Sequence, residues 1–558
     1  MRRRNFLKKI AISAGAPIAF QGVPIRLLGA EQKLARLSAA SQNDRVLIIL
    51  QMHGGNDGIN TIVPLENYDL YYNRRSNIAL PYKSGKRTII PLDSTLPAEQ
   101  QVGLHPDMTD FKSLYDNAKA AVVQGVSYKN NNGSHFRGRD IWFMGGNSDD
   151  YFASGWAGRY LNKLYEPLSY PDDFPNLDMP DPLALEMGNE VSLLFHQEGN
   201  IPTALALGSS PEQLAQLIAQ LQGFDDAGVD PRGLPPAFLN DSPYGKEMNW
   251  ILGLEQKSED YIKRLQEVYQ RAPESPVEYP DQYPFGKSRN PLSSQLRLVA
   301  KLLDGGGEGV KTKIFLLKIG GFDSHARQVE DYDSTLGGHA ALLYHISSAM
   351  RAFQRDLAHR GLEDRVLTMT MSEFGRRIPS NGSYGTDHGT GGPVMLFGRH
   401  VNPGVFGNCP DLNDNNVALQ YDYRQIYASI LRDWLQVDEQ VIRNDIFFGD
   451  FLSIDPGLQL ARDTVLGTDP FIASRFSLEK VFPNPVSSET TLVYHYNAPH
   501  QALLEVIDAN GKKMYQKNVT NEAGRHSVTL ELSFLSPGIY HIRFQSEHLT
   551  KSIKIIKQ

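Results

Sequence analysis

Carboxylate and imidazole side chains gather at the ends of several apolar runs in this 558-residue sequence. They are His53, Asp57, Asp323, His325, Glu373, Asp387 and His388. In one place, these groups would repel one another and lose hydration at a large cost unless a cation neutralised them. Their mixture of oxygen and nitrogen ligands suits zinc, manganese or magnesium. We therefore expect a centre that holds one or two divalent metal ions.

The loop SYGTDHGTGGPVMLFG places two of these side chains next to each other among glycines. We interpret His388 as a metal ligand, and Asp387 as a further ligand or as the group that orients the imidazole. Glycine has no Cβ, so the flanking glycines would let neighbouring backbone pack closely around the ion. A solvated turn would also explain the glycines.

Ser134 stands just before an amphipathic helix in GSHFRGRDIW. Its simplest role is an N-cap, in which the hydroxyl accepts a hydrogen bond from the first turn of the helix. The positive end of the helix dipole would also stabilise an alkoxide that forms from a serine nucleophile. The two roles are compatible.

Other candidates also have simpler interpretations. His325 could be a capping or core histidine, and Glu373 could form a surface ion pair with Arg376 or Arg377 that contributes little stability. His105, in GLHPDM, fits the first turn of a helix or could orient a metal ligand.

Four apolar runs, at 46–52, 120–126, 313–319 and 366–371, are typical of buried strands, and amphipathic helical segments lie between them. Functional groups of an α/β fold lie at the carboxyl ends of its parallel strands. We therefore expect an α/β domain over residues 41–455 whose strand ends bring the candidate ligands into one crevice.

Residues 160–300 contain Pro- and Asp-rich loops separated by helical stretches such as SPEQLAQLIAQLQGF and YIKRLQEVYQRA. We interpret this part as a helical and loop insertion that covers the sheet. A linker at 456–475 follows the α/β domain.

Composition excludes several classes of protein. The net charge of −7 and the pI near 6.1 give no basic footprint for nucleic acid. Cys409 is the only cysteine, so neither an internal disulfide nor a thiolate zinc cluster can form. No apolar run reaches the roughly 18 residues of a transmembrane segment.

Residues 1–40 begin with MRRRNFLKKI and continue into a short, weakly apolar stretch. Arg3-Arg4 in this setting resembles a twin-arginine signal, which predicts export from the cytoplasm through that machinery. A basic N-terminus without a signal function is the alternative.

Residues 476–558 alternate between apolar and polar side chains in short runs, and Asn510-Gly511 is typical of a hairpin turn. We expect a small antiparallel β-sandwich. Its VFPNPVSSETTLVY, DANGK and SPGIY segments resemble the C-terminal sorting domain of the type IX secretion system of Bacteroidetes. That resemblance implies passage through the periplasm to the cell surface or the medium. An ordinary sandwich used for binding is the alternative.

Across about residues 40–450, the motifs LQMHGGNDGINTIVP, LHPDM, GSHFRGRDIWFMG, GGFDSHARQ, TMSEFGRR and GTDHGTGGPVMLFG resemble a bacterial family called domain of unknown function 1501. That family is in turn similar to the alkaline phosphatase and sulfatase superfamily. The resemblance implies an α/β/α sandwich of the alkaline phosphatase kind, with a divalent metal site.

The superfamily resemblance also assigns roles. It puts Ser134 and His135 at the position of the catalytic nucleophile, and Asp323, His325 and His388 among the metal ligands. Two positions depart from the pattern. Phe374 follows Glu373 where the superfamily has a histidine, and His53 stands where it has an aspartate, with Asp57 four residues on.

We expect an exported, metal-dependent hydrolase of phosphate or sulfate esters, with a small ester or a glycan as substrate. A surface-displayed binding or assembly protein that keeps the fold without catalysis is the alternative.

Overall fold

The computed structural model describes residues 43–208, 243–451 and 476–558, apart from short gaps at 497–499, 509–511, 522–523 and 547–548. It also describes β1 (Ile18–Phe20) and β2 (Val23–Ile25), which pair antiparallel. The twin-arginine motif, the helix predicted over SPEQLAQLIAQLQGF, the linker 456–475 and the Asn510-Gly511 turn lie outside the described residues. The chain divides into two compact units, Met1–Ala461 and Arg462–Gln558, and each is described by itself.

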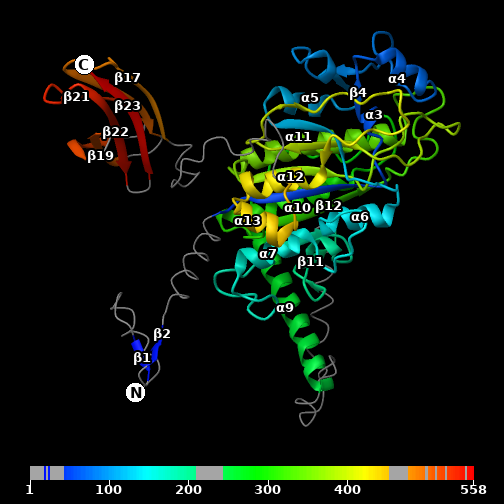
Figure 1. Ribbon diagram of the computed structural model, residues 1–558, viewed down its shortest axis with the longest axis horizontal. Helices are drawn as coiled ribbons and strands as arrows, with labels where there is room; N and C mark the ends of the chain where they lie inside the picture. Colours follow the sequence, from blue (N-terminus) through cyan, green and yellow to red (C-terminus); the bar gives the residue numbers. More distant parts are fainter. Residues whose placement is uncertain are drawn as a thin grey trace. The chain divides into compact units, whose positions relative to one another are not determined.

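A nine-stranded mixed sheet forms the centre of the first unit (Figure 1). Its order is β11-β8-β12-β3-β13-β14-β7-β15, and β16 pairs with β7. The strands are β3 (Val46–His53), β7 (Ala120–Ser127), β8 (Ala184–Met187), β11 (Ala204–Leu207), β12 (Ile314–Gly320), β13 (Val366–Met371), β14 (Gly392–Phe397), β15 (Gly404–Phe406) and β16 (Tyr421–Asp422). The four strands predicted from apolar runs are confirmed.

One strand departs from the expected parallel arrangement. β14 runs antiparallel to both β13 and β7, whereas the other paired strands of this sheet are parallel. The segment between β13 and β14 contains no helix, and a strand that follows without a crossover returns antiparallel. Because β14 reverses against both neighbours, β7 keeps the direction of β13. The ends of β3, β7, β12 and β13 therefore still meet at one edge.

Helices cover both faces of this sheet and make an α/β/α sandwich (Figure 1). One face packs against α5 (Thr109–Asp116), α9 (Pro243–Arg271), α10 (Pro291–Asp304) and α11 (Gly338–His359). The other face packs against α6 (His135–Met144), α7 (Trp156–Tyr165), α12 (Tyr423–Ser429) and the π-helix Ile430–Trp434. Alternate residues of β3 enter the two cores, which is why this strand is almost entirely apolar.

The range 160–300 differs from the expected insertion in one respect. Besides the helices α9 and α10, it contributes the strands β8 and β11, which extend the edge of the sheet. Smaller elements complete the unit: α3 (Gly58–Thr61), β4 (Ile62–Pro64), α4 (Tyr68–Arg74), β5 (Ile90–Pro91), β6 (Val102–Leu104), β9 (His196–Gln197), β10 (Ile201–Pro202) and α13 (Glu439–Val441).

The second unit is an all-β sandwich, as predicted. β17 (Phe476–Phe482), β18 (Glu489–Tyr496) and β21 (Gly524–Glu531) form one antiparallel sheet, and β20 (Lys513–Asn521), β19 (His500–Asp508), β22 (Gly538–Ser546) and β23 (Leu549–Lys557) form the other. Apolar side chains from both sheets, such as Leu492, Leu504 and Phe544, form its core.

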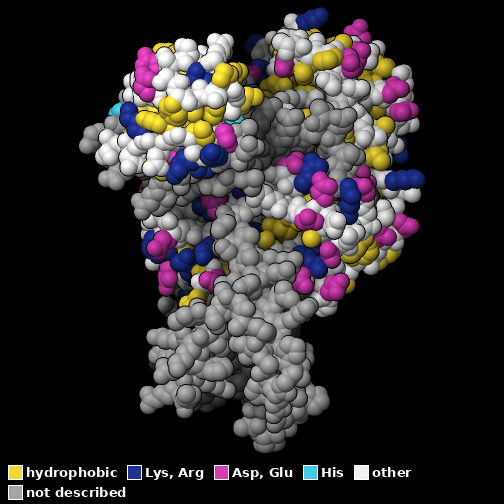
Figure 2. Space-filling model, turned by 60° about the vertical axis from the view of Figure 1, so that its left-hand side comes forward, with side chains coloured by type: hydrophobic (Ala, Val, Ile, Leu, Met, Phe, Trp, Pro, Cys, Tyr) yellow, Lys and Arg dark blue, Asp and Glu magenta, His cyan; other side chains and the backbone are white. Residues whose placement is uncertain are grey.

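Within the part of the chain that the structure describes, no helix is both long and apolar enough to cross a bilayer. On the side of the molecule shown in Figure 2, Lys and Arg side chains of the described residues lie among Asp and Glu side chains rather than in one continuous basic patch.

Three buried histidines of the first unit predict sensitivity to acid. Burial lowers the pKa of His339 to about 4, and it also lowers the pKa of His105 and His345. Below about pH 6.5 the unfolded chain binds protons that the folded chain excludes, so stability is lost as the pH falls. Between pH 7.5 and pH 5, His339 alone should lower the free energy of unfolding by about 2 kcal/mol.

The measurement is denaturant unfolding of the full chain with a chelator present, so that metal binding does not contribute to the pH dependence. The His339→Gln variant should show a shallower pH dependence than the wild type. An identical slope in the two proteins would refute this explanation.

Candidate metal centre

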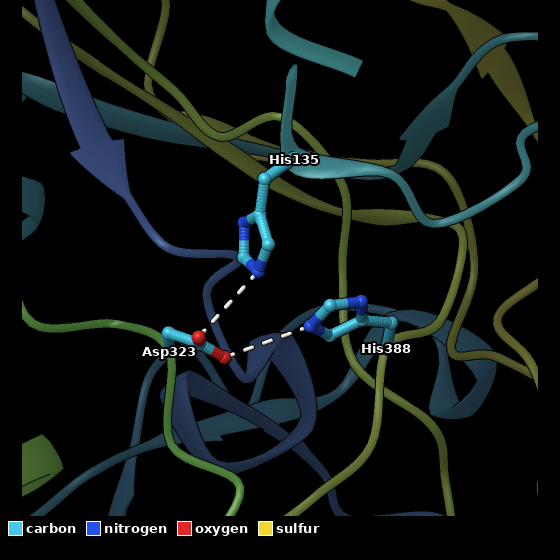
Figure 3. Close-up of side chains that lie close together, drawn as sticks. All are labelled: His135, Asp323 and His388. Atoms are coloured by element: carbon cyan, nitrogen blue, oxygen red, sulfur yellow. Dashed lines mark ion pairs between the residues drawn. The ribbon is translucent and has the colours of Figure 1, made fainter. Parts of the chain in front are cut away.

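Three segments that are distant in the sequence bring His135, Asp323 and His388 together (Figure 3). His135 begins α6, Asp323 follows β12, and His388 lies in the loop before β14. One ligand atom from each residue lies within 4.8 Å of the other two. His135 Nε2 is 3.5 Å from Asp323 Oδ2, and His388 Nε2 is 3.6 Å from Asp323 Oδ1. Two imidazole nitrogens and a carboxylate are a ligand set that zinc and manganese accept.

His325 extends this cluster. Its Nε2 lies 2.8 Å from His388 Nε2 and 3.3 Å from Asp323 Oδ1. On the other side of the ring, His325 Nδ1 lies 3.5 Å from Asp387 Oδ1, which also accepts a 3.1 Å hydrogen bond from Asn381. Asp387 therefore orients His325, and its hydrogen bond with Asn381 and the charge of His325 outweigh burial and lower its pKa.

Glu373 lies beneath the cluster and is fully buried. Its Oε1 accepts a 2.8 Å hydrogen bond from the backbone N–H of Gly54, and it lies 3.0 Å from His135 Nδ1 and 3.6 Å from His53 Nδ1. A surface ion pair with Arg376 or Arg377 is therefore not the role of this carboxylate. Glu373 instead ties His53 and His135 to the end of β13.

In the imidazole rings of His135 and His388, hydrogen bonds engage Nδ1 and leave Nε2 as the atom that can bind a metal. His388 Nδ1 donates to the carbonyl of Gly133 at 2.8 Å, so in the neutral ring Nε2 carries the lone pair. His135 Nδ1 is engaged by Glu373, and His135 Nε2 and Glu373 Oε2 are buried without a hydrogen-bond partner. Buried polar atoms without partners are rare and need an explanation. A divalent cation at this point would satisfy both the nitrogen and the surplus of carboxylates, so the residues fit a metal ion.

Arg376 supports the cluster from below. Its buried guanidinium lies 2.6 Å from Asp323 Oδ1. It also donates to the backbone carbonyls of Gly54, Gly55, Phe322 and Thr386. Burial opposes ionisation of Asp323, but the hydrogen bond and charge of Arg376, together with the neighbouring imidazoles, lower its pKa. Burial and the charge of Arg376 also lower the pKa of His388, which keeps that imidazole neutral and able to bind metal.

Two glycines of the Asp387-His388 loop, Gly385 and Gly389, are needed for close packing. A Cβ at Gly385 would lie 2.5 Å from the backbone of His325, and one at Gly389 would lie 2.4 Å from the backbone of Arg376. No side chain fits at either position without moving the chain. The interpretation that backbone packs tightly here is confirmed, and a solvated turn does not explain it.

Two residues that the sequence suggested for the site, Asp57 and Ser134, make their contacts outside this cluster. Asp57 is fully buried, pairs with Arg75, accepts a 2.5 Å hydrogen bond from Gln328 and caps α3. Ser134 caps α6, and its hydroxyl accepts a 3.4 Å hydrogen bond from the N–H of Arg137.

Three residues that contact the cluster were not predicted from the sequence as site residues. They are Phe374, Arg376 and Asn381. The ring centroid of Phe374 lies 4.8 Å from that of His135 and 4.6 Å from that of His388, so this side chain packs against two imidazoles. Of these three residues, only Phe374 could have been noticed in the sequence, because it stands where the superfamily pattern has a histidine.

Comparison with known proteins finds two family matches, and the first covers a shorter range than the motifs do. Residues 280–445 match the family model described as a protein of unknown function (DUF1501), and residues 480–558 match the secretion system C-terminal sorting domain. Both resemblances are therefore confirmed over these ranges, and the motifs before residue 280 lie outside the first match. The sorting domain indicates a secreted protein, at the cell surface or in the medium, that interacts with the type IX machinery. No curated protein matches the chain.

Among solved structures, this chain is similar to a protein of the alkaline phosphatase superfamily from Vibrio parahaemolyticus, with 9% identity, 96% of this chain and 92% of that chain covered, and a TM-score of 0.30. A sulfatase from Pseudoalteromonas sp. matches with 10% identity, coverage of 92% and 89%, and a TM-score of 0.30. Dimeric latent PorU from Porphyromonas gingivalis matches with 20% identity over 14% of this chain and only 9% of its own length, with a TM-score of 0.13. These values are too low to carry an argument about the site.

Proposed function

We propose that the first unit is a metal-dependent hydrolase of phosphate or sulfate esters. The observation that carries this proposal is that His135 Nε2, which is buried without a hydrogen-bond partner, belongs to a group of ligand atoms with Asp323 and His388 that all lie within 4.8 Å of one another. Structural ion pairs normally satisfy their polar atoms, whereas this cluster leaves the Nε2 atom of His135 without a hydrogen bond.

The residues of the cluster would have two different roles, as metal ligands and as groups that orient the ligands. His135, Asp323, His325 and His388 would hold one divalent ion, while Glu373 and Asp387 orient the rings of His135 and His325. When bound, the ion would polarise the ester oxygens and lower the pKa of a nearby hydroxyl or water. We assign a single ion because Phe374 stands where the superfamily resemblance implies a further histidine ligand, and its ring packs against His135 and His388.

Ser134 is the candidate nucleophile. It precedes His135, so its hydroxyl stands at the N-terminus of α6 next to a cluster residue. The positive end of the helix would stabilise an alkoxide there. The same hydroxyl caps the helix, which favours a second candidate function, a surface binding or assembly protein with a structural metal.

Replacing Ser134 separates these functions. We expect the wild type, purified without chelators, to contain bound metal and to hydrolyse aryl phosphate or sulfate esters. Ser134→Ala should keep the metal, lose turnover and lose about 1 kcal/mol of stability with the cap. Ser134→Asn is the matched control because asparagine restores the cap without a hydroxyl. Its stability should recover while turnover stays absent.

A wild type that binds metal and hydrolyses no ester of a broad panel would favour the binding or assembly protein. A wild type that holds no metal, and whose stability a chelator does not change, would refute both functions.

We further propose that export begins at Arg3-Arg4 through the twin-arginine machinery, which carries folded proteins, and that the protein passes through the periplasm before the sorting domain takes it across the outer membrane. The resemblance of the N-terminal residues to a twin-arginine signal supports the first step.

A further inference from the structure

A cleft of about 430 Å³ begins beside the metal centre, and the proposed chemistry does not use it. Its lining includes Gly320 and Gly321, which immediately precede Phe322 and Asp323. Since consecutive Cα atoms are about 3.8 Å apart, Gly321 lies within about 8 Å of Asp323. The volume falls in the range of about 300–1,000 Å³ that is usual for small-ligand sites. We call it the aromatic cleft because Tyr283, Phe285 and Tyr332 line it.

Two aromatic side chains of the cleft face solvent. Phe285 is 57% exposed and Tyr332 is 76% exposed. Phe285 is nevertheless held in place, because the guanidinium of Arg87 lies 4.2 Å from its ring centroid and pairs with Asp107 at 2.6 Å. Tyr283 packs against Phe285 at 5.7 Å and donates its hydroxyl hydrogen to Asp107 at 2.8 Å. Phe285 is thus an ordered platform, and ordering it on binding would cost little entropy.

The rest of the lining combines the apolar side chains of Leu336, Ala341 and Leu342 with open polar positions. A Cβ at Gly320 or at Gly338 would meet no heavy atom within 4 Å, so the backbone is accessible at both positions. Glu330 and Lys287, both exposed, add an acceptor and a donor at the rim. A suitable ligand therefore has an apolar face that packs on an aromatic ring and several hydroxyl groups around its edge.

We propose that the aromatic cleft binds a pyranose unit of a saccharide and so presents an esterified sugar to the metal centre. A pyranose ring has an apolar C–H face and a rim of hydroxyls, which is the chemistry that these walls match. The identity of the substrate rests on the proposed function, whereas the binding of a neutral saccharide does not.

Titration calorimetry on the full chain tests the binding step. With a chelator present, we expect at least one of the neutral gluco-, xylo-, galacto- and manno-tetraoses to bind the wild type. Phe285→Ala and Tyr332→Ala should each weaken that binding at least tenfold, and Phe285→Tyr should retain it. Tyr151→Ala is the matched control because Tyr151 is 82% exposed and lies under Arg137 at 3.9 Å but does not line the cleft.

The proposal is overturned if no tetraose binds, or if binding survives in Phe285→Ala and Tyr332→Ala. Binding of an apolar peptide in place of every tetraose, with the same loss in the two variants, would assign the cleft to a different ligand and also overturn it.

The two proposals fail in distinguishable ways. If the protein binds a saccharide but hydrolyses no ester, the proposal for the cleft is supported and the proposed hydrolase function is refuted. If both hold, Tyr332→Ala should raise KM for a sulfated or phosphorylated saccharide at least tenfold, whereas the control Tyr151→Ala should leave that KM within twofold.

Discussion

Asp323→Asn is expected to lose most of its bound metal. The Asp323 carboxylate lies within 3.6 Å of the Nε2 atoms of His135, His325 and His388, so it is the anionic centre of the cluster. An amide of the same shape is neutral and a poorer ligand, and we expect metal affinity to fall by more than about 100-fold. Elemental analysis after gel filtration measures the metal that remains.

The loss should also appear in stability. At a metal concentration of about 100 times the dissociation constant, binding adds about 2.7 kcal/mol to the wild type, and the variant should lack this increment. Asp387→Asn is the graded control, because Asp387 contacts the ring of His325 rather than the centre of the cluster. It should lose about 10- to 100-fold in affinity. If Asp323→Asn keeps its full metal content, Asp323 is not a metal ligand.

Arg376→Met is expected to cause the largest loss of stability. The substitution leaves Asp323 without its buried cation and the backbone carbonyls of Gly54, Gly55 and Thr386 without a donor. The carbonyl of Phe322 keeps a hydrogen bond from the N–H of Ser324. The Asp323 side chain is half exposed, so most of the cost comes from the buried carbonyls, and each buried acceptor without a donor costs about 1–3 kcal/mol. Metal affinity should fall as well, because those carbonyls belong to the segments that carry the ligands. Denaturant unfolding with a chelator measures the first effect, and metal titration measures the second.

Arg377 provides a matched control at the next position. It is exposed, so Arg377→Met should change stability by no more than about 0.5 kcal/mol. Arg376→Lys should fall between the two, since lysine keeps the charge but cannot reach all the acceptors of the guanidinium fork. Equal stability of Arg376→Met and Arg377→Met would refute the supporting role.

Sequence alone predicted the strands that carry the ligands because both faces of the sheet are covered. Burial on both sides requires long apolar runs such as 46–52, and these are visible without a structure. β8 and β11 have only four residues each and lie among Pro- and Asp-rich loops, so no periodicity marks them. The direction of β14 depends on the course of the segment between β13 and β14, and the length of that segment does not predict this course.

The site was predictable only as far as strand ends predict proximity. They indicated that Asp323 and His388 would meet, but not where each side chain points. Asp57 turns toward the buried Arg75, and nothing in their spacing shows that pair. Arg376 and Arg377 are indistinguishable in the sequence because burial of one and exposure of the other arise only from tertiary packing.

The origin of the cluster in separate strands has a consequence for how the protein would acquire its metal. Residues from His53 to His388 must come together before the ligand set exists, and no short stretch of the chain contains it. An unfolded chain would therefore bind the ion weakly, and the complete site would form only once the sheet is assembled. The cellular compartment in which folding finishes would then decide which metal the protein carries.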